Sequence, residues 1–476
     1  MKHILRSALV AATVVGLLVG ASAVGAGATA APVTQASGRL SHVGTIDGVP
    51  FRVEVPEDWN GTLVLYSHGY QPVQFPVFPG IGLTNRPPDR ARTETWLLDH
   101  GYAMAASLFQ NDGRGFQVET AQHDQLAVLD WFEANVSTPV HTVATGQSLG
   151  SAIAVQLVER NPDRFDGLLT MCSAYDPNAT FNAALDMQFA IRTLLAPGQD
   201  IPLVHLTDPA ASAQALTDAV ARALETPQGQ ARLALVGALN NVAGWYSTFG
   251  PRPTDPTDRI RQQAAWIANA YVTGLGPFAR ADLEQHLGGN PSSNVGIDYG
   301  RQLALSSQRQ EVRAAYRAAG LDLRNDLAAL AAAPRIAADP AAAAHMQQFV
   351  PQGTAGVPTV TIHTVGDGGA VPDQERWYGS QVRRAGDRGL IRQLYVDRGM
   401  HCAFTDADEI VSLQTLFERI DTGRWPRTTP SHLNQAVAAF PPDHQLVFDF
   451  VETFQDGPMP PAFVHFTPPS LLRPSR

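Results

Sequence analysis

Strand-like segments alternate with helical segments over two stretches of the chain, and this alternation constrains the fold more than any other feature. The stretch 62–66 is almost continuously apolar, which is typical of a strand covered on both faces in a parallel sheet. The other strand-like segments are 38–47, 50–55, 102–106, 140–145, 167–171, 359–364 and 391–396. Helical patterns lie between them at 93–99, 118–134, 151–160 and 373–384. We therefore predict an α/β fold with a doubly wound, mostly parallel sheet.

Residues 173–357 interrupt this alternation. They contain Ala- and Gln-rich helical segments such as 210–224, separated by loops rich in Gly, Pro and Asn, and they show no strand pattern. Because the strand pattern resumes afterwards, we predict one core in two parts, 31–172 and 358–476, with 173–357 inserted as a mainly helical lid.

The end of the chain is predicted to have little regular structure. We expect the last helix at about 406–421, with Thr405 and Asp408 forming its capping box. From residue 425 onward the chain is rich in proline, and we expect this tail to cover the surface of the core.

The segment Gly146-Gln147-Ser148-Leu149-Gly150 joins a strand-like segment to a helical one. In such a Gly-x-Ser-x-Gly turn, small residues on both sides let the serine stand clear of the sheet edge. The N-terminus of the following helix favours negative charge that develops beside it. The setting predicts Ser148 as a nucleophile and makes the alternative, an ordinary turn serine, the weaker interpretation.

A nucleophilic serine needs a base, and the base needs an acid to orient it. Asp367 and His401 each follow a strand-like segment, so both lie where open α/β sheets bind ligands. We predict Asp367 as the acid and His401 as the base. Two alternative acids remain, Asp176 beyond an earlier strand and Asp373, which could instead cap the helix that follows it.

The turn Ser67-His68-Gly69-Tyr70 follows the apolar strand 62–66. We expect the backbone N–H groups of Tyr70 and Leu149 to form an oxyanion hole. We expect His68 to brace this turn rather than to carry a proton. His363 is expected to be part of its strand rather than a second base.

The N-terminus and the cysteines both indicate export. Residues 1–30 combine a basic start, an apolar run and the cleavage pattern Ala28-Thr29-Ala30, as secretory signal peptides do. We predict a secreted, extracellular protein with no membrane anchor after cleavage. The chain has two cysteines, Cys172 and Cys402, and one disulfide between them is the expectation for an exported protein.

Composition excludes several classes of function. Lys2 is the sole lysine, so the mature chain has none and cannot use a pyridoxal Schiff base, a P-loop lysine or a lysine base. The net charge of −10 disfavours nucleic acid as a partner. Two cysteines cannot form a four-thiolate zinc site, and other metal-ligand spacings are not visible, so we predict no cofactor and no required metal. The oligomeric state is left open.

The residue patterns at 67–70, 146–150, 367 and 401 resemble, in kind and order, those of the α/β-hydrolase superfamily, over about residues 40–172 and 358–425. The resemblance implies Ser148 as nucleophile, Asp367 as acid and His401 as base, with the amides of Tyr70 and Leu149 binding the oxyanion.

The stretch His401-Cys402-Ala403-Phe404 also resembles secreted bacterial esterases of the tannase and feruloyl-esterase kind. In those enzymes, cysteines beside the nucleophile and the histidine form a disulfide. This chain departs from that pattern, because Gln147 precedes Ser148 and Cys172 would have to take the place of the missing cysteine.

These observations predict a secreted serine hydrolase that cleaves carboxylic esters, of small-molecule or polymer-derived substrates, through an acyl-enzyme. An amidase or peptidase with the same residues is one alternative, and a non-catalytic binding module on a hydrolase fold is another. The aromatic residues of the insertion could line an acyl site, but we favour the insertion's own core as their role. They are Trp245, Tyr246, Phe249 and Phe278.

Overall fold

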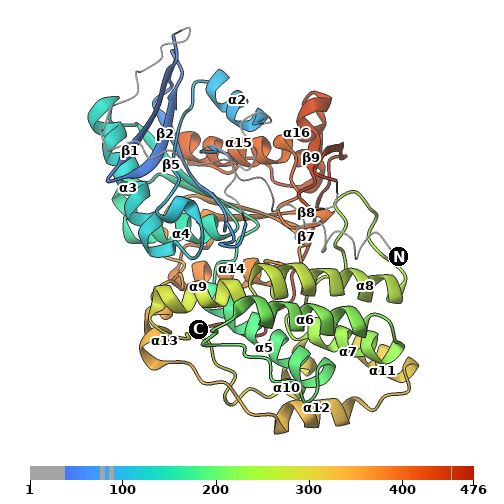
Figure 1. The fold of residues 1–476 in the computed structure, drawn as a ribbon. Coiled ribbons are helices and arrows are strands. Elements are labelled where there is room, and N and C mark those ends of the chain that lie inside the picture. Colours follow the sequence, from blue (N-terminus) through green and yellow to red (C-terminus); the bar gives the residue numbers. More distant parts are fainter. Residues whose placement is uncertain (1–37, 76–80, 85–90, 452, 476) are drawn as a thin grey trace, which may run out of the picture.

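A computed structural model describes residues 38–75, 81–84, 91–451 and 453–475. A sheet with flanking helices forms one half of the molecule, and a set of helices packed beneath it forms the other (Figure 1). The signal peptide predicted at 1–30 lies outside the described residues. In the part of the chain that is described, no helix has both the length and the apolar character needed to cross a bilayer.

The main sheet has nine strands in the order β1-β2-β4-β3-β5-β6-β7-β8-β11. The central strands from β4 to β8 run parallel, whereas β1, β2 and β11 are antiparallel to their neighbours. The strands are β1 (Leu40–Ile46), β2 (Val49–Val55), β3 (Thr62–Ser67), β4 (Ala103–Ser107), β5 (His141–Gln147), β6 (Gly167–Met171), β7 (Thr359–Gly366), β8 (Ile391–Gly399) and β11 (Phe463–Val464). The predicted doubly wound, mostly parallel sheet is confirmed.

Helices cover both faces of this sheet at its centre, which explains why the central strand β3 has no polar face. In β3, Leu63 and Leu65 pack in the cluster that holds α3 and α4, and Val64 packs in the cluster that holds α2 and α15. The helices of the core are α2 (Arg92–Asp99), α3 (Val118–Asn135), α4 (Leu149–Arg160), α14 (Asp373–Ala385), α15 (Asp406–Thr422) and α16 (Pro430–Ala438). Short 3-10 turns occur at η2 (Asn111–Gly113), η3 (Pro162–Arg164), η5 (Arg388–Leu390) and η6 (Pro442–His444).

The chain between β6 and β7 is helical, as the loss of strand pattern indicates, and we call it the helical insertion. Many of its helices begin with an aspartate or threonine followed by proline. The side chains of Asp176, Asp208, Thr226 and Asp255 cap the next helix, and proline fits its first turn. The helices are α5 (Pro177–Leu195), α6 (Pro209–Ala223), α7 (Pro227–Ala238), α8 (Pro256–Trp266), η4 (Ile267–Gly274, a π-helix), α9 (Pro277–Leu287), α10 (Tyr299–Leu305), α11 (Arg309–Ala318), α12 (Leu323–Ala332) and α13 (Pro340–Gln347).

The C-terminal part holds more structure than the sequence analysis predicts. The capping box of Thr405 and Asp408 is present at α15, but the expectation that α15 is the last helix is wrong, because α16 follows. Pro430 occupies the first turn of α16, where proline costs no hydrogen bond, and the buried residues Leu433 and Val437 lie one turn apart. Prolines in this segment therefore begin a helix instead of preventing one.

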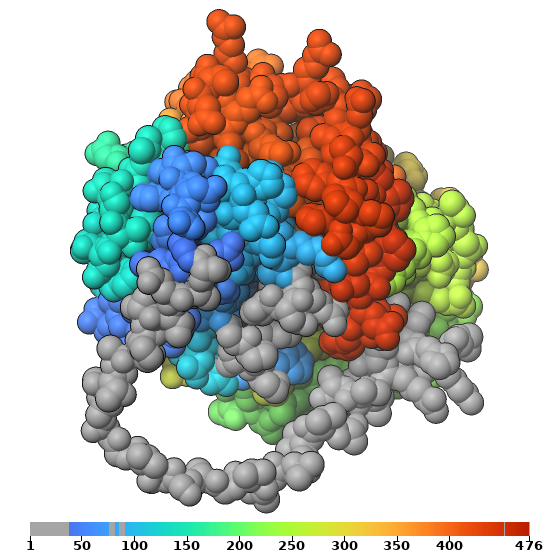
Figure 2. Space-filling model, turned by 90° about the horizontal axis from the view of Figure 1, so that it is seen from above, coloured from blue at the N-terminus to red at the C-terminus, as the bar shows by residue number. Residues whose placement is uncertain are grey.

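The segment after α16 joins the core through strands. The hairpin β9 (Leu446–Phe448) and β10 (Asp456–Pro458) precedes β11, which pairs with β8 at the edge of the main sheet. An edge strand tolerates the prolines around it. In space this segment lies beside the early part of the chain (Figure 2). Arg92 Nε of α2 lies 3.6 Å from Asp443 Oδ2.

Candidate active site

The turn between β5 and α4 holds Ser148 in a conformation that few side chains adopt, with φ 53° and ψ −121°. Two glycines make this turn possible. A Cβ on Gly146 would lie 2.2 Å from the carbonyl oxygen of Gly150, and a Cβ on Gly150 would lie 2.1 Å from that of Ser67. The Gly-x-Ser-x-Gly pattern is therefore a steric requirement, and it presents the serine at the end of β5.

Hydrogen bonds to β6 fix the turn from behind. The N–H of Ser148 donates to the carbonyl oxygen of Met171 at 2.8 Å. The hydroxyl of the buried Ser151 donates to the carbonyl oxygen of Gly146 at 2.6 Å and accepts from the N–H of Met171 at 3.0 Å. A strained backbone persists only where such neighbours over-determine it. The sequence analysis does not identify Ser151, since a serine in the first turn of a helix has no distinctive signal.

Ser148, His401 and Asp367 form one hydrogen-bonded chain. His401 Nε2 lies 2.8 Å from Ser148 Oγ, and His401 Nδ1 lies 2.5 Å from Asp367 Oδ2. The carboxylate places the ring hydrogen on Nδ1, so Nε2 is free to take the serine proton. The side chains come from the ends of three parallel strands, β5, β7 and β8, as their positions in the sequence predict.

Asp367 is fully buried, yet its surroundings favour the ionised carboxylate. Asp367 Oδ1 accepts backbone N–H groups from Gly369 at 2.8 Å and Ala370 at 3.1 Å. Burial by itself would raise the pKa of Asp367. The charge on His401, the hydrogen bond from His363 and the hydrogen bond from His401 outweigh that cost, and they hold the pKa below its usual value.

The two alternative acids have other partners. Asp176 caps α5 by accepting the N–H of Ala179 at 2.8 Å, and it also accepts the hydroxyl of Ser475 at 2.7 Å. Asp373 begins α14 and accepts a hydrogen bond from the side-chain amide of Asn241 at 2.6 Å, and burial raises its pKa to about 7. The aspartate that contacts His401 Nδ1 is Asp367.

The turn after β3 lies against Ser148, because β3 and β5 are neighbours at the point where strand order reverses in the sheet. A Cβ on Gly69 would lie 3.3 Å from Ser148 Cβ, so Gly69 is in contact with the serine. Tyr70, whose N–H is expected in the oxyanion hole, is the next residue. Leu149 is the first residue of α4, so its N–H has no partner within the helix.

His68 has the structural environment that the sequence analysis expects. Its ring nitrogens lie 2.8 Å from the carbonyl oxygen of Gly69 and 3.0 Å from that of Leu108, and its ring stacks on Phe109. Burial lowers the pKa of His68. The ring therefore ties the turn after β3 to the end of β4.

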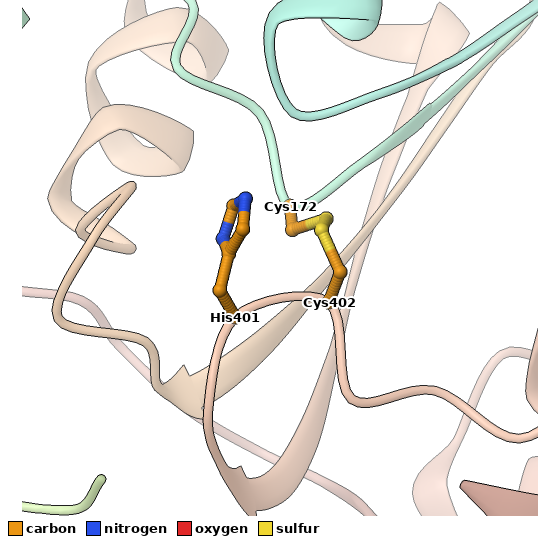
Figure 3. Close-up of side chains that lie close together, drawn as sticks. All are labelled: Cys172, His401 and Cys402. Carbon is orange, nitrogen blue, oxygen red and sulfur yellow. A yellow bond between two sulfur atoms is a disulfide. The ribbon is translucent and has the colours of Figure 1, made fainter. Parts of the chain in front are cut away.

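A disulfide joins Cys172 at the end of β6 to Cys402, with Cα atoms 5.3 Å apart. Figure 3 shows the His401 ring beside this bond. Cys172, His401 and Cys402 are close enough to form a metal-binding group, but sulfurs in a disulfide are not thiolate ligands. Cys172 follows Met171, whose carbonyl oxygen accepts the hydrogen bond from the N–H of Ser148. The disulfide therefore lies beside the serine turn, although the residue before Ser148 is Gln147 and not a cysteine.

A buried ion pair supports the loop that carries His401. Arg398 donates to Asp408 Oδ2 at 2.5 Å and to the carbonyl oxygen of Ala403 at 3.1 Å. Asp408 is also the residue that completes the capping box with Thr405. These contacts therefore hold together the end of β8, the loop that carries His401 and the start of α15.

The helical insertion directly contacts the loop after β7, which contains Asp367. The Tyr271 hydroxyl lies 2.8 Å from the carbonyl oxygen of Gly368 and 2.9 Å from that of Gly369. Trp266 packs on Gly368 so closely that a Cβ there would lie 2.5 Å from the indole ring. The π-helix η4 and the end of α8 thus fix the loop that follows β7.

The aromatic residues considered for an acyl site mostly belong to packed interiors. Trp245 is buried against Val365 and Tyr395, and Tyr246 is buried with Trp266 in the core of the insertion. The expected place in the insertion's own core is confirmed for Tyr246, whereas Trp245 packs against β7 and β8 of the sheet. Phe278 is partly buried, and Phe249 is 39% exposed.

Comparison with known proteins gives one relative by sequence. The o-phthalyl amidase of Xanthobacter agilis is 27% identical over 425 residues, which cover 83% of this chain and 90% of that protein. No family model matches the chain.

Solved structures give broader but weaker likenesses. Est1E from Butyrivibrio proteoclasticus is 11% identical, covers 80% of this chain and 99% of its own, and superposes with a TM-score of 0.35. Feruloyl esterase B from Aspergillus oryzae is 13% identical, covers 82% and 81%, and also has a TM-score of 0.35.

Because these TM-scores are low, the fold is assigned from the sheet itself. Parallel strands run from β4 to β8 in the order 4-3-5-6-7-8, with β2 antiparallel to β4 and a strained serine turn between β5 and α4. By this topology the chain has the α/β-hydrolase fold.

Proposed function

We propose that the protein is a secreted serine hydrolase that cleaves carboxylic esters. The observation that carries the proposal is the hydrogen-bonded chain from Ser148 through His401 to Asp367. A serine on a strained turn, a histidine with a free Nε2 and a buried, ionised aspartate are the groups that acyl transfer requires. A non-catalytic binding module would not need all three side chains in this hydrogen-bonded arrangement.

Each group has one task in the reaction. Ser148 Oγ attacks the acyl carbonyl as His401 Nε2 removes its proton, and Asp367 stabilises the imidazolium that forms. The N–H groups of Tyr70 and Leu149 donate to the oxyanion of the tetrahedral intermediate. His401 then gives the proton to the leaving alcohol, and water releases the acyl group from Ser148 by the same steps in reverse.

Amide hydrolysis is the second candidate, and the sequence relative favours it. The o-phthalyl amidase shares 27% identity with this chain over most of both proteins. An amine is a poorer leaving group than an alcohol, so His401 must deliver its proton before the C–N bond breaks. The same three side chains can do this, and how effectively His401 delivers its proton to the leaving group decides whether amides are cleaved as well as esters.

The first experiment tests the nucleophile. We expect the mature protein to hydrolyse p-nitrophenyl esters in a series from acetyl to decanoyl, and Ser148→Ala to lower kcat/KM by about a thousandfold or more. The control is Ser431→Ala, an exposed serine of α16, with unchanged kcat/KM. Equal activity of the wild type and Ser148→Ala would remove Ser148 from the mechanism.

Two further measurements separate the alternatives. A benzoyl ester and the matching benzoyl anilide compare alcohol and amine leaving groups on one acyl group, and a preference for the anilide would assign the protein as an amidase. Failure of a fluorophosphonate probe to label Ser148 would support a binding module. Secretion is tested by N-terminal sequencing of the protein in the culture medium, which we expect to begin at Ala31.

A further inference from the structure

A second histidine lies directly behind the acid of the proposed triad. His363 is in β7 and is fully buried, and its Nε2 lies 3.4 Å from Asp367 Oδ2. That same carboxylate oxygen bonds to His401 Nδ1. The proposed mechanism leaves His363 unused, although it contacts the carboxylate that orients His401.

The partners of His363 determine its protonation. Its Nε2 lies 2.7 Å from the carbonyl oxygen of Ala370, and its Nδ1 lies 3.0 Å from Glu375 Oε1. A carbonyl oxygen can only accept, so Nε2 carries a hydrogen, and a carboxylate partner places a hydrogen on Nδ1. The geometry is that of an imidazolium between two acceptors, with the carboxylate of Asp367 beside it.

Glu375 is arranged to be the counter-ion. Its Oε2 accepts the hydroxyl of Thr361 at 2.6 Å and the side-chain amide of Gln393 at 3.2 Å, which leaves Oε1 for His363. Both residues of the pair are fully buried. Burial opposes a charge on His363, but the hydrogen bonds to Asp367 and Glu375 outweigh it and raise its pKa to about 10.

The other titratable groups around this pair provide no substitute for the cation. Tyr175 donates to Glu375 Oε2 at 3.4 Å, and Tyr395 of β8 is the register partner of His363. Tyr271 of the insertion and Asp373 of α14 also interact with the cluster electrostatically. Burial raises the pKa of each of these tyrosines, so they stay neutral, and Asp373 can add only negative charge.

We propose that His363 is a positioning residue for hydrolysis, a permanently charged imidazolium that, paired with Glu375, keeps Asp367 ionised and aimed at His401. This inference rests on the proposed function of Ser148, His401 and Asp367. Its consequence is electrostatic. The buried cation lies behind the carboxylate that orients His401, so it opposes the gain of a further positive charge in the site.

The test is the pH dependence of kcat/KM for a p-nitrophenyl ester. In His363→Gln the cation is gone, the site as a whole gains a proton more readily, and the acidic limb of the profile moves up by about one pH unit. Because this variant leaves Glu375 buried without its partner, the double variant His363→Gln/Glu375→Gln is measured beside it. The double variant removes both charges, but it still lacks the cation next to Asp367. Its acidic limb therefore also moves to higher pH, by less than that of His363→Gln.

If His363 had only a structural role, its loss would lower kcat/KM at every pH and leave the position of the acidic limb unchanged. An unmoved acidic limb in the double variant, or in the single variant if it folds, therefore overturns the proposal. The wild type and Ser148→Ala are run in parallel. If the wild type has no Ser148-dependent activity, the proposed function has failed, and the profile is replaced by a measurement that needs no activity.

That measurement is the nitrogen NMR spectrum of the wild-type protein labelled with 15N-histidine. At pH 9 the proposal expects one imidazolium with both ring nitrogens protonated, while the other histidines are neutral. The signal should be missing from any folded variant that lacks His363. A spectrum at pH 9 in which every histidine is neutral overturns the inference, whatever the protein hydrolyses.

Discussion

Asp367 and Asp373 are both buried at one end of α14, yet their environments favour opposite ionisation. Asp367 receives two backbone N–H groups and two imidazole rings, which hold its pKa low, whereas burial raises the pKa of Asp373 to about 7. The difference is one of partners and not of burial. Only the first of these carboxyl groups is suited to stabilise a protonated His401.

Matched substitutions test this assignment. We expect Asp367→Asn to lower kcat/KM by about a thousandfold or more, because an amide cannot balance the charge on His401 and favours the wrong ring tautomer. Asp373→Asn preserves shape and its contact with Asn241, and it should leave kcat/KM within about threefold, a control for any change in this part of the core. Steady-state kinetics on one ester decide the matter, and a reversed order of the two variants would make Asp373 the acid.

At the scale of elements, the site depends on how the connections after β6 and β8 are joined. The Cys172–Cys402 disulfide links them across a sequence separation of 230 residues, and the unfolded chain would otherwise be free to separate them. A bond across such a long interval restricts the unfolded ensemble strongly.

We expect the double variant Cys172→Ala/Cys402→Ala to lose about 2–5 kcal/mol of unfolding free energy. Removing both cysteines avoids a free thiol. The loop of His401 loses its covalent tie and keeps the Arg398–Asp408 pair, so kcat should fall more than KM rises. Urea unfolding with and without a reductant provides the check. The reductant should shift the wild-type midpoint and leave that of the variant unchanged, and two coincident wild-type curves would contradict the expectation.

The same scale shows what the sequence could predict. Strands β1 to β8 follow from local patterns, whereas β11 does not. Residues 148, 367 and 401 follow too, because each lies at the end of a strand-like segment. His363 was expected to be only a strand residue, since its partners Asp367 and Glu375 come from a loop and from the next helix. Helix α16 does not follow from the sequence pattern, because a segment rich in proline is typical of an irregular tail.

At the scale of the whole molecule, the end of the chain holds the core and the helical insertion together. After β11 the chain crosses to α5, where Arg473 pairs with the fully buried Asp186 and the N–H of Ser475 donates to Asp176 Oδ2 at 2.8 Å. Burial favours the neutral form of Asp186 and raises its pKa despite Arg473. Breaking this pair leaves a carboxylate buried without its partner.

We therefore expect Arg473→Met to lower the unfolding free energy by about 3 kcal/mol or more. The double variant Asp186→Asn/Arg473→Met removes both charges and should recover most of that loss. Urea unfolding followed by tryptophan fluorescence measures all three proteins. The expectation is contradicted if the double variant is no more stable than Arg473→Met.

The position of the helical insertion also sets the order in which a ribosome makes this sheet. β6 is complete long before its neighbour β7, because all the helices from α5 to α13 are synthesised between them. During that interval β6, which contains Leu168 and Leu169, has one unpaired backbone edge, and such an edge can pair with another nascent chain. The chain is thus most exposed to aggregation before β7 emerges, and changes that slow translation of the insertion should lower soluble yield without altering the finished protein.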